Sequence, residues 1–171
     1  MARESEPEFP DRRHPYRLPP EEYRVVDTPT MFTLCARRGV ELAQPAAVSA
    51  LVNAMRRVGL RRATRVHAYC VMPDHLHVVC SLVDSGKDLS KWAWYVKRES
   101  ARALRAPGMW QRSYWDRYVR DDESLVRAVE YLLANPVRRG LAEPWCEWPY
   151  SWCEWYPETR GPDPNQHDRA G

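Results

Sequence analysis

The sequence predicts an α+β fold, in which an antiparallel sheet of ferredoxin-like strand order carries helices on one face. Three observations support this prediction. Segments with strand and helix patterns follow one another in the order strand, helix, strand, strand, helix, strand. The two central strands are separated by Pro73-Asp74, a pair that suits a tight turn. The chain of 171 residues is long enough to bury one core.

The first half of the chain is expected to contain a strand, a helix and a hairpin. β-Branched and aromatic residues after a proline predict a strand at 28–38. Apolar residues at helical spacing predict a helix at 45–60. Residues 64–72 and 75–83 are expected to pair as the two strands of the hairpin.

The second half is expected to contain two helices and one strand. A helix that is basic along much of its length is predicted at 87–106, and a strand at 113–121. The last helix, at 121–137, opens with an aspartate cap and acidic residues in its first turn. It is expected to stop at Pro136, because proline disfavours helix in the residue before it.

The composition predicts one domain between two polar segments. Residues 1–27 are rich in proline and charge, residues 28–156 hold the predicted elements, and residues 157–171 have the composition of a disordered tail. The five cysteines show no Cys-x-x-Cys pairing, which favours reduced thiols in a cytosol over disulfides. No apolar run is long enough to cross a bilayer, so a cytoplasmic protein is expected.

Two histidines, His75 and His77, lie one residue apart on the predicted third strand. Alternate residues of a strand point to the same face, so both imidazoles are expected on one face, with Leu76 and Val78 on the other. This arrangement is typical of a pair of metal ligands, and it also fits two ordinary surface histidines. The spacing alone leaves both interpretations open.

Tyr131 and Asn135 lie four residues apart on the predicted last helix, at the edge of its apolar stripe. Both side chains are therefore expected to face the same side of the sheet. Taken by themselves, they also fit a tyrosine at a core boundary and an asparagine near a helix C-terminus.

Four segments taken together carry a family resemblance: MPDHLH (72–77), MWQRSYWDRYVRDDESL (109–125), AVEYLLANPVRRGL (128–141) and EWPYSW (147–152). In these segments the chain resembles the REP-associated tyrosine transposases, bacterial relatives of the single-tyrosine HUH transposases of insertion sequences. The resemblance extends over residues 28–153, and its most specific part is the Tyr-x-x-x-Asn-Pro-Val-x-x-Gly-Leu run. It implies the HUH endonuclease/transposase fold for residues 28–156.

The resemblance also implies a site and a reaction. His75 and His77 would bind a divalent metal, Mg²⁺ or Mn²⁺, with Asn135 as third ligand and Tyr131 as nucleophile. Attack of a tyrosine on a phosphodiester leaves a 5′-phosphotyrosine and a free 3′-OH, so rejoining needs no ATP. The mixed nitrogen and oxygen ligand set does not choose between the two metals. No general base is assigned, because Glu130 points about a quarter-turn away from Tyr131.

The partner that the resemblance implies is single-stranded DNA that folds into palindromic hairpins, in a bacterial cell and at the nucleoid. Arg112, Arg117 and Arg120 are expected to line a cleft beside the site. Lys97 and Arg98 are further candidates, because cations near tryptophans suit single strands. A basic helix face is also often simply solvated, so both interpretations of Lys97 and Arg98, DNA contact and solvated surface, stay open. The chain is equally compatible with a monomer and a homodimer.

Two other functions stay open at the level of sequence. A domesticated protein could bind DNA hairpins without cleaving them, although the intact His75, His77, Tyr131 and Asn135 argue against such a loss. A metal-dependent hydrolase could use Asp74 with the two histidines, but that function would leave the tyrosine and the asparagine unexplained.

Overall fold

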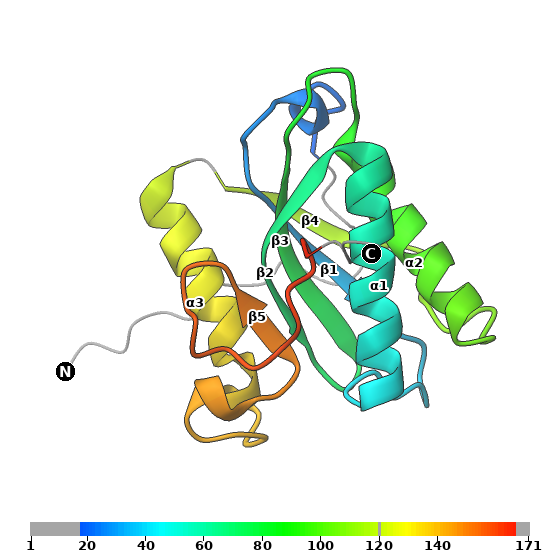
Figure 1. Cartoon of the computed structure of the whole chain (residues 1–171), viewed down its shortest axis with the longest axis vertical. Coiled ribbons are helices and arrows are strands. Elements are labelled where there is room, and N and C mark those ends of the chain that lie inside the picture. Colours follow the sequence, from blue (N-terminus) through cyan, green and yellow to red (C-terminus); the bar gives the residue numbers. More distant parts are fainter. Residues whose placement is uncertain (1–17, 120, 167–171) are drawn as a thin grey trace, which may run out of the picture.

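The computed structural model describes residues 18–119 and 121–166. Five antiparallel strands form one sheet in the order β4-β1-β3-β2-β5 (Figure 1). The strands are β1 (Thr30–Cys35), β2 (Thr64–Val71), β3 (His75–Leu82), β4 (Trp115–Tyr118) and β5 (Ser151–Cys153). The order of the first four strands is ferredoxin-like, which confirms the predicted fold class. The short strand β5, added at the β2 edge, was not predicted.

Helices cover both faces of this sheet. The helices are α1 (Pro45–Arg62), α2 (Trp92–Ala103) and α3 (Asp122–Arg138), with short 3-10 turns η1 (Glu22–Arg24), η2 (Leu89–Lys91) and η3 (Trp145–Glu147). Figure 1 shows α1 and α2 on one side of the sheet and α3 on the other. Two separate apolar clusters follow from this arrangement, one beneath α1 and α2 and one beneath α3. The prediction that helices lie on one face of the ferredoxin-like sheet is therefore confirmed for α1 and α2, and α3 covers the other face.

The β2–β3 hairpin forms as its alternating pattern predicts. Met72 N donates to His75 O at 2.8 Å across the turn. Leu76 and Val78 are fully buried in the cluster under α1 and α2. Residues opposite each other in the sheet point to the same face, and His77 pairs with Cys70, which belongs to the cluster under α3. The two histidines therefore lie on the α3 face.

Helix α3 begins as expected but ends later. The Asp121 carboxylate caps it by accepting from Ser124 N at 2.7 Å. The helix then continues through Pro136 to Arg138, so the prediction that it stops at Pro136 is wrong. Proline has no N–H for the carbonyl of Leu132, four residues earlier. The Asn135 amide nitrogen donates to that carbonyl at 3.4 Å and to Tyr131 O at 2.8 Å. The Leu132 carbonyl therefore has a donor in place of the missing proline N–H.

The C-terminal region packs along the β2 edge of the sheet. Trp148 Nε1 donates to Val71 O at 3.0 Å, and β5 pairs with β2 just beyond. Residues 157–166 do not behave as the expected disordered tail: the Tyr69 hydroxyl donates to Pro162 O at 2.9 Å, and Asn165 Nδ2 donates to Val66 O at 2.8 Å. Residues 167–171 lie outside the described part of the chain.

At the other end of the chain, residues 1–17 also lie outside the described part, and residues 18–27 lead into β1. Within them Tyr23 is buried, and its hydroxyl donates to the Asp116 carboxylate on β4. Among the described residues, none of the helices combines the length and the apolar character that crossing a bilayer requires.

Candidate functional site

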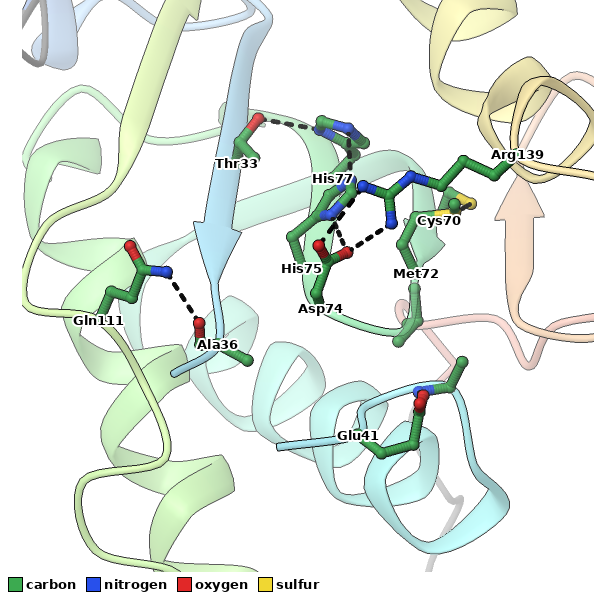
Figure 2. Close-up of polar contacts among 12 residues, drawn as sticks. Thr33, Ala36, Glu41, Cys70, Met72, Asp74, His75, His77, Gln111 and Arg139 are labelled. Carbon is green, nitrogen blue, oxygen red and sulfur yellow. Dashed lines mark hydrogen bonds and ion pairs between the residues drawn. The ribbon is translucent and has the colours of Figure 1, made fainter. Parts of the chain in front are cut away.

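His75 and His77 bring two ring nitrogens together on the α3 face of the sheet. Their Nε2 atoms are 3.0 Å apart, and the ring planes meet at 77°. Figure 2 shows both rings at the start of β3, beside the end of the β2–β3 turn. The shared strand face that the His-x-His spacing predicts is therefore realised with the two Nε2 atoms converging.

The opposite nitrogen of each ring is held by a neighbouring side chain. His77 Nδ1 contacts Thr33 Oγ1 at 2.8 Å, and the β1–β3 register sets these two residues opposite each other. His75 Nδ1 contacts Asp74 Oδ1 at 2.7 Å. A partner on Nδ1 fixes the orientation of an imidazole and directs Nε2 at whatever lies on its other side.

Burial keeps both rings in the neutral form. His77 is only 4% exposed, and this burial holds its pKa well below the ordinary value. Burial also lowers the pKa of His75, against the opposing effect of the Asp74 carboxylate. A neutral imidazole has a lone pair to offer, whereas an imidazolium does not. The pair is therefore suited to binding a divalent cation at neutral pH.

Asp74 connects the histidines to the end of α3. Arg139 meets its carboxylate in a fork, with Nη1–Oδ1 at 3.0 Å and Nη2–Oδ2 at 3.4 Å (Figure 2). Partial burial raises the pKa of Asp74, but the hydrogen bonds and charges of His75 and Arg139 outweigh it and lower the pKa overall. Asp74 is therefore an ionised partner of His75, with its carboxylate already engaged by two groups.

Tyr131 and Asn135 lie on α3, which packs over β2 and β3. The Tyr131 ring meets the His77 ring edge to face, with centroids 6.1 Å apart, and Arg138 Cζ lies 5.0 Å from the tyrosine ring centroid. Asn135 is 9% exposed, and its amide nitrogen is bonded to the helix carbonyls described above. The amide oxygen is therefore the atom of this side chain that is suited to a cation. The structure thus places the Tyr131 ring beside His77.

Lys97 does not lie where the prediction of a DNA contact requires. It is 8% exposed, and its ammonium donates to the main-chain carbonyls of Gln111 at 2.8 Å and Ser113 at 2.6 Å. An ammonium buried against two carbonyls holds the α2–β4 connection in place and is not presented to a phosphate. Arg98 is exposed beside the Trp94 ring, at 5.2 Å, but α2 lies across the sheet from the histidines.

The arginines near β4 are better placed for a DNA contact than Lys97 and Arg98. Arg117 is exposed and pairs in register with Met31, whose side chain belongs to the cluster under α3, so Arg117 points to the face of the histidines. Trp115 and His77 both pair with Thr33 and therefore share this face as well. Arg112 is exposed in the connection before β4. Arg120 lies outside the described residues.

Among the described residues, acidic and sulfur side chains do not complete a metal site with the histidines. Within residues 18–119 and 121–166, no group of three or more His, Cys, Asp or Glu side chains is arranged to hold a metal ion. The two histidines have an amide, Asn135, as the remaining candidate on the helix above them. Because the Asp74 carboxylate is committed to His75 Nδ1 and Arg139, the geometry also argues against a hydrolase that uses Asp74 as a ligand.

Sequence reasoning missed the side chains that orient the histidines. Thr33 lies 44 residues before His77, and Arg139 lies 65 residues after Asp74. The arginine is part of the same 128–141 segment that carries the tyrosine and the asparagine, which is the signal that would have identified it. No local pattern marks Thr33, because only the β1–β3 register brings it to the ring.

Comparisons with known proteins identify relatives of this chain. A Haemophilus influenzae protein named for the REP-associated tyrosine transposases is 31% identical over 118 residues, which cover 57% of this chain and 67% of that protein. The REP-associated tyrosine transposase of Escherichia coli is 27% identical over 101 residues, covering 59% of this chain and 61% of that protein. No protein-family model matches the chain.

The fold agrees with that of a solved structure. A REP-associated tyrosine transposase bound to a REP hairpin superposes with a TM-score of 0.73 at 22% identity, over 91% of this chain and 95% of that one. The superposition shows a shared fold, and the sequence match to the Haemophilus influenzae protein shows the family. The chain belongs to the family of REP-associated tyrosine transposases.

Proposed function

We propose that this protein cleaves and rejoins hairpin-bearing single-stranded DNA through a 5′-phosphotyrosine intermediate on Tyr131, with a divalent metal bound by His75, His77 and Asn135. The observation that carries the proposal is the contact between the Tyr131 and His77 rings, 6.1 Å between centroids. It sets a phenol beside two converging imidazole nitrogens. Family membership supports the same reaction.

The side chains of the site fit a divalent metal such as Mg²⁺ or Mn²⁺, because the two imidazoles and the Asn135 amide would supply a mixed nitrogen and oxygen ligand set. The two Nε2 atoms that would bind it lie 3.0 Å apart. The Asn135 amide oxygen would be the third ligand. When bound, the ion would neutralise charge on the scissile phosphate and help the 3′ oxygen to leave.

Tyr131 performs the bond exchange. Its phenolic oxygen attacks phosphorus and loses its proton, the bond to the 3′ oxygen breaks, and that oxygen takes up a proton to become a free 3′-OH. The reverse exchange restores the phosphodiester and releases the tyrosine. The Arg138 guanidinium, 5.0 Å from the phenol ring centroid, would favour the negative charge that develops on the phenolic oxygen.

The DNA is proposed to lie over the α3 face and the β4 edge of the sheet. The solved relative is bound to a REP hairpin, and we propose a palindromic hairpin as the substrate of this chain as well. Arg117 shares the face of the histidines, and Arg112 is exposed in the connection that precedes its strand. Together with Arg120 they would contact phosphates beside the site, where Trp115 offers a ring for stacking.

The test is a covalent-adduct assay. A labelled hairpin oligonucleotide with an unpaired flank, taken from palindromes of the host genome, is incubated with protein and Mn²⁺ and run on a denaturing gel. The wild-type protein should form a protein–DNA adduct, and Tyr131→Phe should form none while binding the hairpin nearly as well, because only the hydroxyl is lost.

Two results would contradict the proposal. An adduct that persists in Tyr131→Phe and maps to Tyr114 or Tyr118 would assign the nucleophile elsewhere. Hairpin binding by the wild-type protein without any adduct, with or without metal, would favour a protein that binds DNA and has lost cleavage.

A further inference from the structure

Asp74 joins two parts of the candidate site that belong to different elements (Figure 2). Its carboxylate contacts His75 Nδ1 at 2.7 Å and also receives the Arg139 guanidinium at 3.0 and 3.4 Å. His75 is the first residue of β3, whereas Arg139 is the C-cap of α3. One carboxylate therefore connects the histidine hairpin with the helix that carries Tyr131.

The loop that holds Asp74 is itself fixed on the sheet. Ala36 N, at the end of β1, donates to Asp74 O at 2.8 Å, and Leu42 N donates to Pro73 O at 2.8 Å. These bonds hold the loop backbone, so the Asp74 carboxylate is presented to Arg139 and His75 from a fixed position.

The same carboxylate orients the imidazole. Accepting the Nδ1 proton of His75 leaves the Nε2 lone pair directed at His77 Nε2, 3.0 Å away. Carboxylates bonded to metal-binding histidines in this way fix the tautomer and the ring orientation. Arg139 holds the carboxylate through two hydrogen bonds in a fork, a geometry that the single ammonium of lysine cannot reproduce.

We propose that Arg139 is a positioning residue, which acts through Asp74 to keep His75 in the orientation of a metal ligand and to keep the Tyr131 helix in register with the histidines. The inference rests on the metal-dependent function proposed above. The two side chains are 47% and 59% exposed, so a role in overall stability alone should be small.

The experiment measures Mn²⁺ binding to the full chain without DNA, by calorimetric titration. It compares the wild-type protein with Asp74→Ala, Arg139→Gln, Arg139→Lys and the double variant Asp74→Ala/Arg139→Gln. Arg57→Gln is the matched control, because Arg57 is exposed on α1, across the sheet from the site. Hairpin affinity in the presence of a chelator and the midpoint of thermal unfolding are measured for every variant.

The expected result is a loss of Mn²⁺ affinity of about tenfold for Asp74→Ala and a smaller loss for Arg139→Gln and Arg139→Lys. Arg139→Gln should have no further effect once Asp74 is alanine, since arginine acts only through the carboxylate. Arg57→Gln should bind Mn²⁺ like the wild-type protein. Hairpin affinity in chelator should change by less than about twofold, since the pair is not proposed to contact DNA.

Other results would overturn the inference and identify which part fails. If His75→Ala abolishes Mn²⁺ binding but Arg139→Gln binds Mn²⁺ normally, the positioning role is wrong while the metal site stands. If Arg139→Gln weakens hairpin binding in chelator as strongly as Mn²⁺ binding, Arg139 contacts DNA directly. If the wild-type protein binds no Mn²⁺, the proposed function fails and this inference fails with it.

Discussion

Single residues in the site combine two separate tasks. His77 is held at Nδ1 by Thr33 and meets the Tyr131 ring edge to face. His75 is held at Nδ1 by Asp74, and its Nε2 atom lies 3.0 Å from His77 Nε2. In each case one atom of the ring is fixed by the protein, and another is turned toward the place where the chemistry is proposed. This division leaves one nitrogen of each ring available for the proposed ion.

At this scale we predict that His75→Ala and His77→Ala each abolish the covalent adduct. Two remaining ligands cannot hold a phosphate and an ion in the geometry that three can, so excess Mn²⁺ should rescue either variant poorly. The adduct assay with increasing Mn²⁺ measures this. Undiminished adduct formation by either variant in the presence of a chelator would remove the metal from the mechanism.

At the scale of elements, adjacent cations on α2 have opposite surroundings. Lys97 is buried against the carbonyls of Gln111 and Ser113 and so attaches α2 to the connection before β4. Arg98, the next residue, is exposed beside Trp94. Consecutive residues of a helix point about 100° apart, which is enough to put one side chain into the packed layer and the other into solvent.

We therefore predict different effects for Lys97→Met and Arg98→Met. Lys97→Met leaves two buried carbonyls without their donor and should lower the free energy of unfolding by about 1–3 kcal/mol. Arg98→Met should change it by less than about 0.5 kcal/mol. Urea unfolding measures both. If Lys97→Met is as stable as the wild-type protein but binds hairpins much more weakly, then Lys97 contacts DNA as the sequence predicts.

At the scale of the whole molecule, the C-terminal residues close one edge of the sheet. Gly161 N donates to Ser151 O at 2.7 Å, and Arg56 of α1 donates to Asp163 O at 2.7 Å. A Cβ at Gly161 would lie 2.5 Å from Ser151 O and 2.8 Å from Ser151 C, both main-chain atoms that cannot move aside cheaply. The absence of a side chain at Gly161 therefore allows this segment to approach β5.

Gly161→Ala should accordingly detach this segment from the sheet. We expect a loss of about 1–3 kcal/mol in the free energy of unfolding, as for other overpacked sites, and faster hydrogen exchange at the Val66 amide, which donates to Asn165. Gly86→Ala is the control, because the nearest atom to its added Cβ is 3.6 Å away. Equal stability of the two variants would mean that the packing of residues 157–166 is unimportant for the fold.

The proposed function also leads to a prediction about the form of the DNA. Tyr131 lies on a helix above a sheet face, so a scissile phosphate would have to enter between them with its bases splayed. Unstacking a duplex costs a few kcal/mol per step, whereas a single strand loses much less. We predict cleavage of a single-stranded hairpin in its unpaired flank and none when the same strand is annealed to its complement. Equal cleavage of both forms, or a free 5′-phosphate without an adduct, would favour a hydrolase.

Much of the fold and the centre of the site follow from local patterns. Apolar spacing predicts α1, the His-x-His alternation predicts the face of His75 and His77, and the spacing of Tyr131 and Asn135 predicts that they share a helix face. Such patterns are reliable because side-chain direction in a strand or helix depends on position within that element alone. The continuation of α3 through Pro136 was not predicted, because proline disfavours helix in the residue before it, and in the structure the Asn135 amide donates to the Leu132 carbonyl that the proline leaves without a donor.

The sequence by itself determined the class of fold, the histidine pair, the tyrosine and the family resemblance that links them. Only the tertiary structure decided that α3 lies on the face opposite α1 and α2, that Lys97 is buried, and that Asp74 meets Arg139 across 65 residues of chain. The physical reason is that these features depend on strand register and on which surfaces are left to cover. Both arise from contacts between distant segments, which the periodicity of any one segment does not specify.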